Sequence, residues 1–239
     1  MNKFWRFQQV MNAAGTATET VLTLNGYIAQ ESWFGDEVTP AVFKSELAAC
    51  KGDITVWINS PGGDCFAASE IYTALKEHNG AIKVKIDGIA ASAASVIAMA
   101  GDMVEMSPTA MIMIHNPALL LYGEAAELEQ GIEFLNEVKE SIINAYQLKS
   151  GLSRAKIGKL MDAETWFNTR AAIEHGFCDR MMYSEDAAPV IENFSFNKAA
   201  MVTNTVSAMR KKLKTIEKSN ADDGIKISDL ASRLNLIRR

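Results

Sequence analysis

The sequence predicts an α/β protein with a mostly parallel sheet. Short runs with β-branched residues at alternate positions are repeatedly followed by runs with apolar residues at helical spacing. Such strand–helix alternation is typical of βαβ units, whose strands pair in parallel. A chain of 239 residues, 48% of them apolar and 22% charged, has the composition of a globular protein and is long enough to bury a core.

The first eighty residues begin this alternation. Two β-type runs flank a polar, glycine-containing segment, which favours a hairpin or two successive strands. Thr39 is a suitable N-cap, and Pro40 fits the first helical position after it. The next strand ends at the sequence SPGG, where a helical pattern starts. The expected elements are strands at 3–10, 20–28 and 53–60 and helices at 40–50 and 65–80.

The rest of the body continues in the same way. Its longest helix, 124–150, carries one apolar face made of Leu128, Ile132, Leu135, Val138, Ile142 and Tyr146. Ser153 is a suitable cap for the helix that follows. The expected elements are strands at 82–87, 103–106, 110–116 and 177–183 and helices at 94–101, 124–150, 153–161 and 169–176.

The segment 184–193 separates a predicted domain, 1–185, from a basic helical tail, 186–239. From residue 198 to residue 239 there are ten Lys/Arg and four Asp/Glu, although the whole chain has a net charge of −5. A basic tail on an acidic body could bind nucleic acid or an acidic partner, and the plainer alternative is a solvated helix face.

The cysteines and the hydropathy pattern indicate the compartment. Three cysteines without a CxxC pair argue against a disulfide framework and against a structural zinc site. No apolar run approaches 18 uncharged residues, and the first residues lack a signal-peptide pattern. We therefore expect a cytoplasmic protein with no membrane span and no structural zinc site.

Unusual residues stand at the expected carboxyl ends of three strands, where α/β folds place functional groups. Paired amides at Gly62 and Gly63 could face a developing oxyanion, or the pair could simply form a tight turn. Ser92 lies among glycine and alanine at a strand-to-helix turn, which suits either a nucleophile or close packing. His115 directly follows a strand and is the best general base, because His78 and His175 stand at helix C-termini.

The sequences INSPGGD, DGIAASAAS and MIHNP, in this order and spacing, resemble the Clp proteolytic-subunit (ClpP-like) family of serine peptidases over residues 20–183. The resemblance implies a crotonase-like spiral of β-β-α units. It makes Ser92 the nucleophile and His115 the base, and it leaves Ser95 as a packing residue. A serine peptidase of this kind implies no metal and no organic cofactor. It assigns the oxyanion amides to Gly63 and Ala93. The family's substrate strand follows the double glycine, so Gly62, Asp64 and Cys65 are expected to bind substrate.

The acid of the triad departs from the family pattern. Counting back without gaps from Asp179, the acid's position falls on Glu164. Asp162, two residues earlier, is the alternative, and Asp179 itself is expected to be structural. A glutamate is chemically sufficient to orient a histidine.

The sequence AETW and the short N-terminal part are more similar to Clp-like proteases of phage and prophage head-assembly modules, which trim scaffold or capsid proteins. The resemblance implies a homo-oligomeric ring, with 124–150 making the ring-to-ring contact, in host cytoplasm or procapsid. The different N-terminal part argues against an unfoldase ATPase partner. Two alternatives stay open, namely a crotonase-type acyl-CoA hydratase or isomerase and a proteolytically silent assembly subunit.

Overall fold

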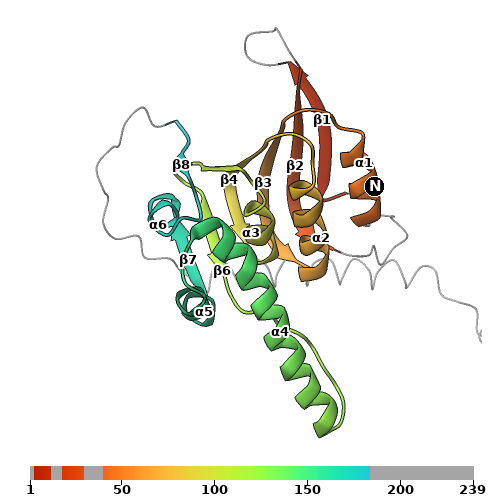
Figure 1. Ribbon diagram of the computed structural model, residues 1–239, viewed down its shortest axis with the longest axis vertical. Coiled ribbons are helices and arrows are strands. Elements are labelled where there is room, and N and C mark those ends of the chain that lie inside the picture. Colours follow the sequence, from red (N-terminus) through yellow and green to blue (C-terminus); the bar gives the residue numbers. More distant parts are fainter. Residues whose placement is uncertain (1–2, 12–17, 30–39, 184–239) are drawn as a thin grey trace, which may run out of the picture. The chain divides into compact units, whose positions relative to one another are not determined.

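The computed structural model describes residues 3–11, 18–29 and 40–183 (Figure 1). Its strands are β1 Trp5–Met11, β2 Thr18–Ile28, β3 Ile54–Gly63, β4 Ile82–Ala91, β5 Met103–Met106, β6 Met111–Ile114, β7 Thr165–Asn168 and β8 Arg180–Met181. Its helices are α1 Pro40–Ala48, α2 Cys65–Lys76, α3 Ala93–Ala98, α4 Ala125–Ser150, α5 Arg154–Asp162 and α6 Thr169–Glu174.

The described strands form one mixed sheet. Its main order is β1-β2-β3-β4-β5-β8, with β6 paired to β4 and β7 paired to β6. Five of the seven strand pairings are parallel, and the pairs β1–β2 and β6–β7 are antiparallel. The α/β class with a mostly parallel sheet is therefore confirmed for the described part of the chain.

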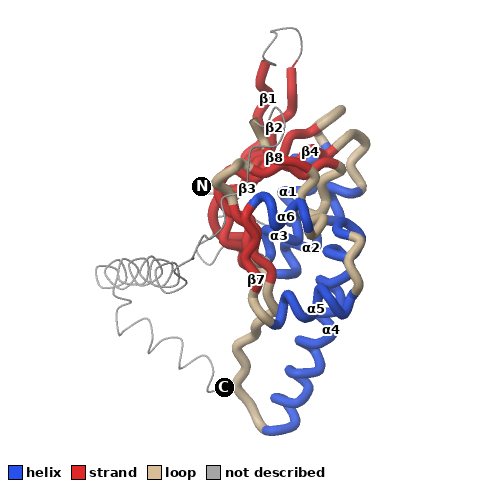
Figure 2. Tube along the Cα trace, turned by 90° about the vertical axis from the view of Figure 1, so that its left-hand side faces the viewer, coloured by secondary structure: helices blue, strands red, loops and turns tan. Residues whose placement is uncertain are grey.

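The helices lie to one side of the sheet (Figure 2). This explains why buried and more exposed side chains alternate along its parallel strands. The side chains of Ile54, Val56 and Ile58 in β3 are buried on the helix side. Between them, Trp57 is only partly buried, and the Nζ atom of Lys85 in β4 lies 5.0 Å from its ring centroid. One covered face thus produces the period-two pattern that the sequence carries.

Strand β4 is long enough to pair with two strands on the same edge. Its first half, Lys83–Ile86, pairs with β5, and its second half, Ile89–Ala91, pairs with β6. On the other edge, Ser60 of β3 lies opposite Ala90. The carboxyl ends of β3, β4 and β6 therefore meet side by side, which positions the candidate site.

Most predicted elements are confirmed, and the differences have local causes. The hairpin β1–β2 and the helix beginning at Pro40 are as expected, whereas Thr39 and the whole tail 186–239 lie outside the described residues. Asp64 is the N-cap of α2 and Cys65 its first residue, so the predicted helix, and not the substrate strand that the resemblance implies, follows the double glycine. Strand β7 has no counterpart in the predicted elements, since its four residues are too few to show a period.

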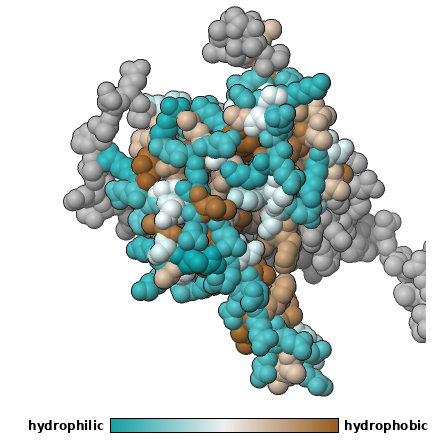
Figure 3. Space-filling view, in the orientation of Figure 1, coloured by the Kyte–Doolittle hydropathy of each residue, from teal (hydrophilic) through white to brown (hydrophobic). Residues whose placement is uncertain are grey.

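Helix α4 has two unlike halves. Ile142 and Tyr146 of its C-terminal half are buried against the body, whereas Leu128 and Ile132 of the same apolar stripe are exposed. The exposed half extends beyond the other helices in Figure 1, and Figure 3 shows hydrophobic residues along it. Among the described helices, none is both long and apolar enough to span a membrane.

Candidate active site

Ser92 occupies a sharp turn between β4 and α3. Its backbone has φ 55° and ψ −125°, a conformation that residues with a side chain rarely adopt. The alanines on either side of it (Ala90, Ala91, Ala93 and Ala94) are all buried, so larger side chains would have no room there. The sequence supplies small residues where the chain must turn sharply, and the turn presents the half-buried hydroxyl of Ser92 at the sheet edge.

The β4–β6 pairing brings His115 to Ser92. Ala91 lies opposite Met113, and the Ser92 amide donates a 2.9 Å hydrogen bond to the Met113 carbonyl. His115 follows two residues later, and its Nε2 atom lies 2.7 Å from Ser92 Oγ. When Nδ1 of His115 carries the ring proton, Nε2 accepts the hydrogen of the serine hydroxyl. This is the geometry that a nucleophile and its base require.

Burial lowers the pKa of His115 below its ordinary value, and the negative charge of Glu164 opposes this by raising it. Burial has the larger effect because it removes water from the charged form of the imidazole. The imidazole is therefore neutral at neutral pH and available to accept a proton. Glu164 also stabilises the imidazolium that such a transfer would create.

The antiparallel pairing of β6 with β7 explains why Glu164 acts on His115. Ile114 lies opposite Thr165, so one further step of the same register sets His115 against Glu164. Glu164 has φ 47° and turns the chain from α5 into β7. The indole Nε1 of Trp166 donates a 3.4 Å hydrogen bond to its carboxylate. Of the two acids that the sequence offers, this is the one whose charge reaches the histidine.

Asp162 has other partners. Its exposed carboxylate accepts hydrogen bonds from the Lys139 ammonium and from Asn116 Nδ2, the latter at 2.9 Å, and these bonds lower its pKa. Asp179 accepts a hydrogen bond from the Val104 amide at 2.6 Å and one from Lys149 at 2.7 Å. Asp179 therefore joins β5 to α4, in keeping with its expected structural part.

The glycine pair lies directly against the serine turn. A Cβ atom built on Gly62, which has φ +97°, would fall 2.6 Å from the Ala91 carbonyl oxygen and 2.8 Å from Ser92 Cβ. A Cβ atom on Gly63 would fall 1.9 Å from the Ile28 carbonyl oxygen. Buried Ser60 fixes the turn, because its hydroxyl donates to the Gly26 carbonyl at 2.6 Å and accepts from the Gly62 amide at 3.1 Å. Only glycine allows this close approach of three strand ends.

The residues after the glycine pair begin a helix. The Asp64 carboxylate accepts hydrogen bonds from the amides of Phe66 and Ala67, both at 2.8 Å, so it caps α2. Burial raises the pKa of the neighbouring Cys65 thiol, and the charge of Asp64 raises it further. The structure thus gives Asp64 a local task, while a role of Asp64 and Cys65 in substrate binding stays a prediction.

The other two histidines have structural contacts. Nε2 of His78 lies 2.7 Å from the Gly52 carbonyl oxygen. Nδ1 of His175 lies 2.9 Å from the Ala171 carbonyl oxygen, and its ring packs on Phe167. Ser95, expected to serve in packing only, is both buried and hydrogen-bonded to the serine turn. Its signal in the sequence is the spacing of one helical turn from Ser92.

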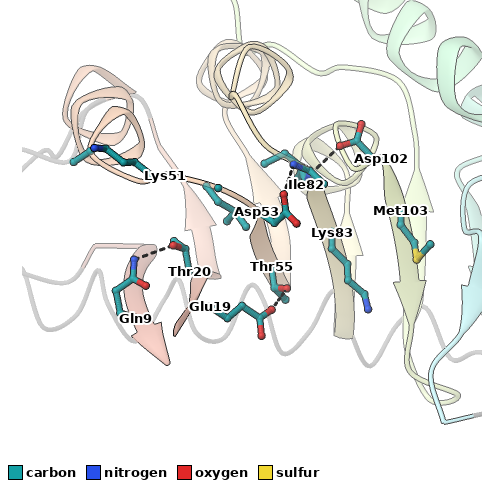
Figure 4. A pocket seen from close by; sticks show the side chains of 14 residues that line it. Gln9, Glu19, Thr20, Lys51, Asp53, Thr55, Ile82, Lys83, Asp102 and Met103 are labelled. Carbon is teal, nitrogen blue, oxygen red and sulfur yellow. Dashed lines mark hydrogen bonds between the residues drawn. The ribbon is translucent and has the colours of Figure 1, made fainter. Parts of the chain in front are cut away.

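A separate hollow lies away from this site. It has a volume of about 890 Å³ and is lined by the first residues of β3, β4 and β5, including Ile54, Ile82 and Met103 (Figure 4). Two of its carboxylates, Asp53 and Asp102, accept hydrogen bonds from the amides of Ala81 and Ile82. Because β3 and β4 begin here and end at the serine turn, the hollow lies at the opposite edge of the sheet.

Within the described ranges, no group of three or more His, Cys, Asp or Glu side chains could hold a metal ion. The site instead combines a hydroxyl, an imidazole, a carboxylate and a turn of backbone amides. This set can carry out acyl transfer, in which a hydroxyl attacks a carbonyl group.

The comparisons with known proteins agree with this chemistry. The family model described as Clp protease matches residues 12–185. The ATP-dependent Clp protease proteolytic subunit of Porphyromonas gingivalis is 29% identical over 154 residues, which cover 62% of this chain and 69% of that protein. Proteolytic subunit 1 of Chlamydia muridarum is 31% identical over 143 residues, 58% of this chain and 74% of that protein. Proteolytic subunit 1 of Protochlamydia amoebophila is 28% identical over 160 residues, with coverages of 65% and 78%.

Proposed function

Because the chain belongs to the Clp protease family, we propose that it is a serine endopeptidase with Ser92 as nucleophile, His115 as base and Glu164 as the acid behind the base. The observation that carries the proposal is the 2.7 Å contact between Ser92 Oγ and His115 Nε2 at a strained strand-to-helix turn. Sparsely populated backbone conformations cluster at active sites, which supports a functional role for this turn.

In the proposed reaction Ser92 Oγ attacks the carbonyl carbon of a peptide bond while His115 Nε2 takes the hydroxyl proton. The tetrahedral intermediate then collapses, the C–N bond breaks, and His115 passes the proton to the leaving amine. Water, deprotonated by the same imidazole, hydrolyses the acyl-enzyme and restores the serine. Glu164 keeps the imidazole oriented and stabilises its charged form at each transfer.

The oxyanion of the intermediate is proposed to lie between the amides of Ala93 and Gly63. The Ala93 amide follows the nucleophile and is the first of α3, where backbone N–H groups have no partner within the helix. A Cβ atom on Gly62 would fall 3.0 Å from that amide nitrogen, so the glycine turn lies close to it. Amide donors fixed around a developing negative charge stabilise the transition state.

The first experiment measures hydrolysis of a fluorogenic peptide library and labelling by a fluorophosphonate probe, in wild type, Ser92→Ala and Ser95→Cys. Wild type should hydrolyse peptides and be labelled once, at Ser92, and Ser92→Ala should lose both. Ser95→Cys should still be labelled at Ser92. A crotonase-type enzyme, which needs no activated serine, would not react with the probe. Peptide hydrolysis that persists in Ser92→Ala would remove the proposal.

We further propose that the substrates are scaffold or capsid proteins, as in the phage proteases that the sequence AETW resembles. The test co-expresses the chain with the proteins encoded beside it and compares intact masses of the products between wild type and Ser92→Ala. Shortened products should appear only with wild type. Identical products in both would favour the alternative of a proteolytically silent assembly subunit.

A further inference from the structure

The carbonyl oxygen of Ser92 is held by three donors. The Ser95 amide donates at 2.9 Å, the Val96 amide at 3.4 Å and the Ser95 hydroxyl at 2.6 Å. The two amide bonds belong to the first turn of α3. The hydroxyl bond is additional, and it comes from a side chain that is fully buried.

The Ser95 hydroxyl is held in turn by a tyrosine from a different element. Tyr146 of α4 is 1% exposed, and its hydroxyl lies 2.7 Å from Ser95 Oγ. A carbonyl oxygen can only accept, so the single Ser95 hydrogen points at the Ser92 carbonyl. Tyr146 must therefore donate its hydrogen to Ser95. The result is a row of two hydrogen bonds, in which Tyr146 donates to Ser95 and Ser95 donates to the Ser92 carbonyl.

These two hydrogen bonds fix the orientation of the peptide unit that joins Ser92 to Ala93. The described peptide bonds include no cis bond, and in a trans peptide the C=O and N–H groups point in opposite directions in one plane. Fixing the carbonyl of Ser92 therefore fixes the direction of the Ala93 N–H. That N–H is the oxyanion donor of the proposed reaction.

We propose that Ser95 and Tyr146 are positioning residues of the oxyanion hole, which orient the Ala93 amide through the Ser92–Ala93 peptide. The inference rests on the proposed function of Ser92. It also explains how the turn keeps its strained conformation, since a sparsely populated φ/ψ pair persists only where the surroundings determine it. Rotation of the peptide would relieve that strain and turn the amide away from the site.

An ordinary helical serine gives the contrast. Ser69 of α2 also donates to a carbonyl one turn earlier, that of Cys65, at 2.9 Å, but it is exposed. Serine side chains in helices commonly donate a hydrogen bond to a carbonyl of the preceding turn. At Ser95 the same bond is buried and is continued by a tyrosine 51 positions away in the sequence. A buried hydroxyl left without a partner destabilises its surroundings, so this contact is held in place.

The test compares Tyr146→Phe, Ser95→Ala and the double variant with wild type. Tyr72→Phe, which removes a hydroxyl from a half-buried tyrosine of α2, and Ser69→Ala are matched controls. Active sites are counted by fluorophosphonate titration, so that partial unfolding does not register as slow catalysis. The readouts are kcat and KM for a fluorogenic peptide, the Ki of a peptide aldehyde and the Ki of the corresponding peptide alcohol.

We expect kcat per active site to fall about tenfold in Tyr146→Phe, a fraction of the roughly 10²–10³-fold cost of deleting an oxyanion donor outright. KM and the alcohol's Ki should stay unchanged. The aldehyde's Ki should rise by the same factor as kcat falls, because its hemiacetal oxygen occupies the oxyanion position. The double variant should be no slower than Ser95→Ala, since both residues act through one chain. The two controls should match wild type.

Two outcomes would overturn the inference while leaving the proposed function intact. One is a wild-type kcat per active site in both Tyr146→Phe and Ser95→Ala. The other is a rise in KM and in both inhibition constants together, which would indicate a general distortion of the site. If wild type neither hydrolyses peptides nor labels at Ser92, the proposed function fails and the inference fails with it.

Discussion

At the scale of residues, the site depends on which charge reaches His115. Burial lowers the pKa of this histidine, and the charge of Glu164 opposes that effect. Asp162 is bonded to Asn116 and Lys139 instead. The two carboxylates are close in sequence, but the β6–β7 register separates them, because one further step of that register sets Glu164, and not Asp162, against the histidine. The titration of His115 can therefore distinguish them.

We predict that the acidic limb of kcat/KM has its midpoint below pH 6.5, the ordinary value of histidine, because the base must be neutral to act. Activity should rise as the pH rises through the lowered pKa. Glu164→Gln should move the midpoint to still lower pH, because the charge that raises the pKa is gone. It should also reduce kcat by roughly 10²–10⁴-fold, since the imidazolium loses its partner.

Asp162→Asn is the matched control, because it removes a carboxylate two positions away. It should leave the midpoint of the acidic limb in place. Profiles of kcat/KM between pH 4.5 and 8 for the two variants decide the matter. A midpoint that shifts in Asp162→Asn and stays in Glu164→Gln would assign the acid to Asp162.

At the scale of elements, the turn that ends β3 determines how closely β3 approaches the serine. Gly62→Ala should abolish most peptide hydrolysis, because the new Cβ atom would fall 2.8 Å from Ser92 Cβ at a φ of +97°. The expected loss of stability is about 1–3 kcal/mol, measured by urea unfolding. Gly158→Ala is the control, since a Cβ there meets nothing within 4 Å. Peptide hydrolysis at the wild-type rate in Gly62→Ala would show that catalysis does not need the close approach of Gly62 to the Ser92 turn.

An element could be predicted from the sequence where neighbouring residues determine it, and could not where contacts between distant residues determine it. Helix α2 and strand β3 follow from spacing and from the SPGG turn, so the sequence suffices for them. Strand β7 exists because it pairs with β6, a contact between residues more than fifty positions apart. Without β7 the sequence alone favours Glu164 by its position and leaves Asp162 open as the alternative. The Ser95–Tyr146 bond escapes prediction for the same reason, because it depends on how α4 packs on α3.

At the scale of the whole molecule, helix α4 connects the site to a surface. Its buried half carries Tyr146, which contacts the serine turn through Ser95. Its exposed half carries Leu128, Ile132 and Phe134, which are 42%, 61% and 46% exposed. The segment before it adds the exposed side chains of Leu119, Leu120, Leu121 and Tyr122. Contiguous exposed apolar surface of this kind marks an interaction site, and the family resemblance makes a second copy of the chain the expected partner.

We predict that the chain forms ring assemblies and that Ile132→Glu splits them. In a symmetric assembly each substitution recurs in every copy, so a single buried charge weakens all equivalent contacts at once. Burying an isoleucine stabilises a contact by about 1.5–3 kcal/mol, which the variant loses before the cost of desolvating the charge is added. Sedimentation velocity at micromolar concentration should show a large species for wild type and a smaller one for Ile132→Glu, with unchanged circular dichroism.

Leu148→Glu, 80% exposed on the other half of the same helix, is the control and should sediment as wild type. A wild-type chain that sediments only as monomer would contradict the predicted assembly. An intact assembly in Ile132→Glu would show that the exposed half of α4 does not make the contact between copies.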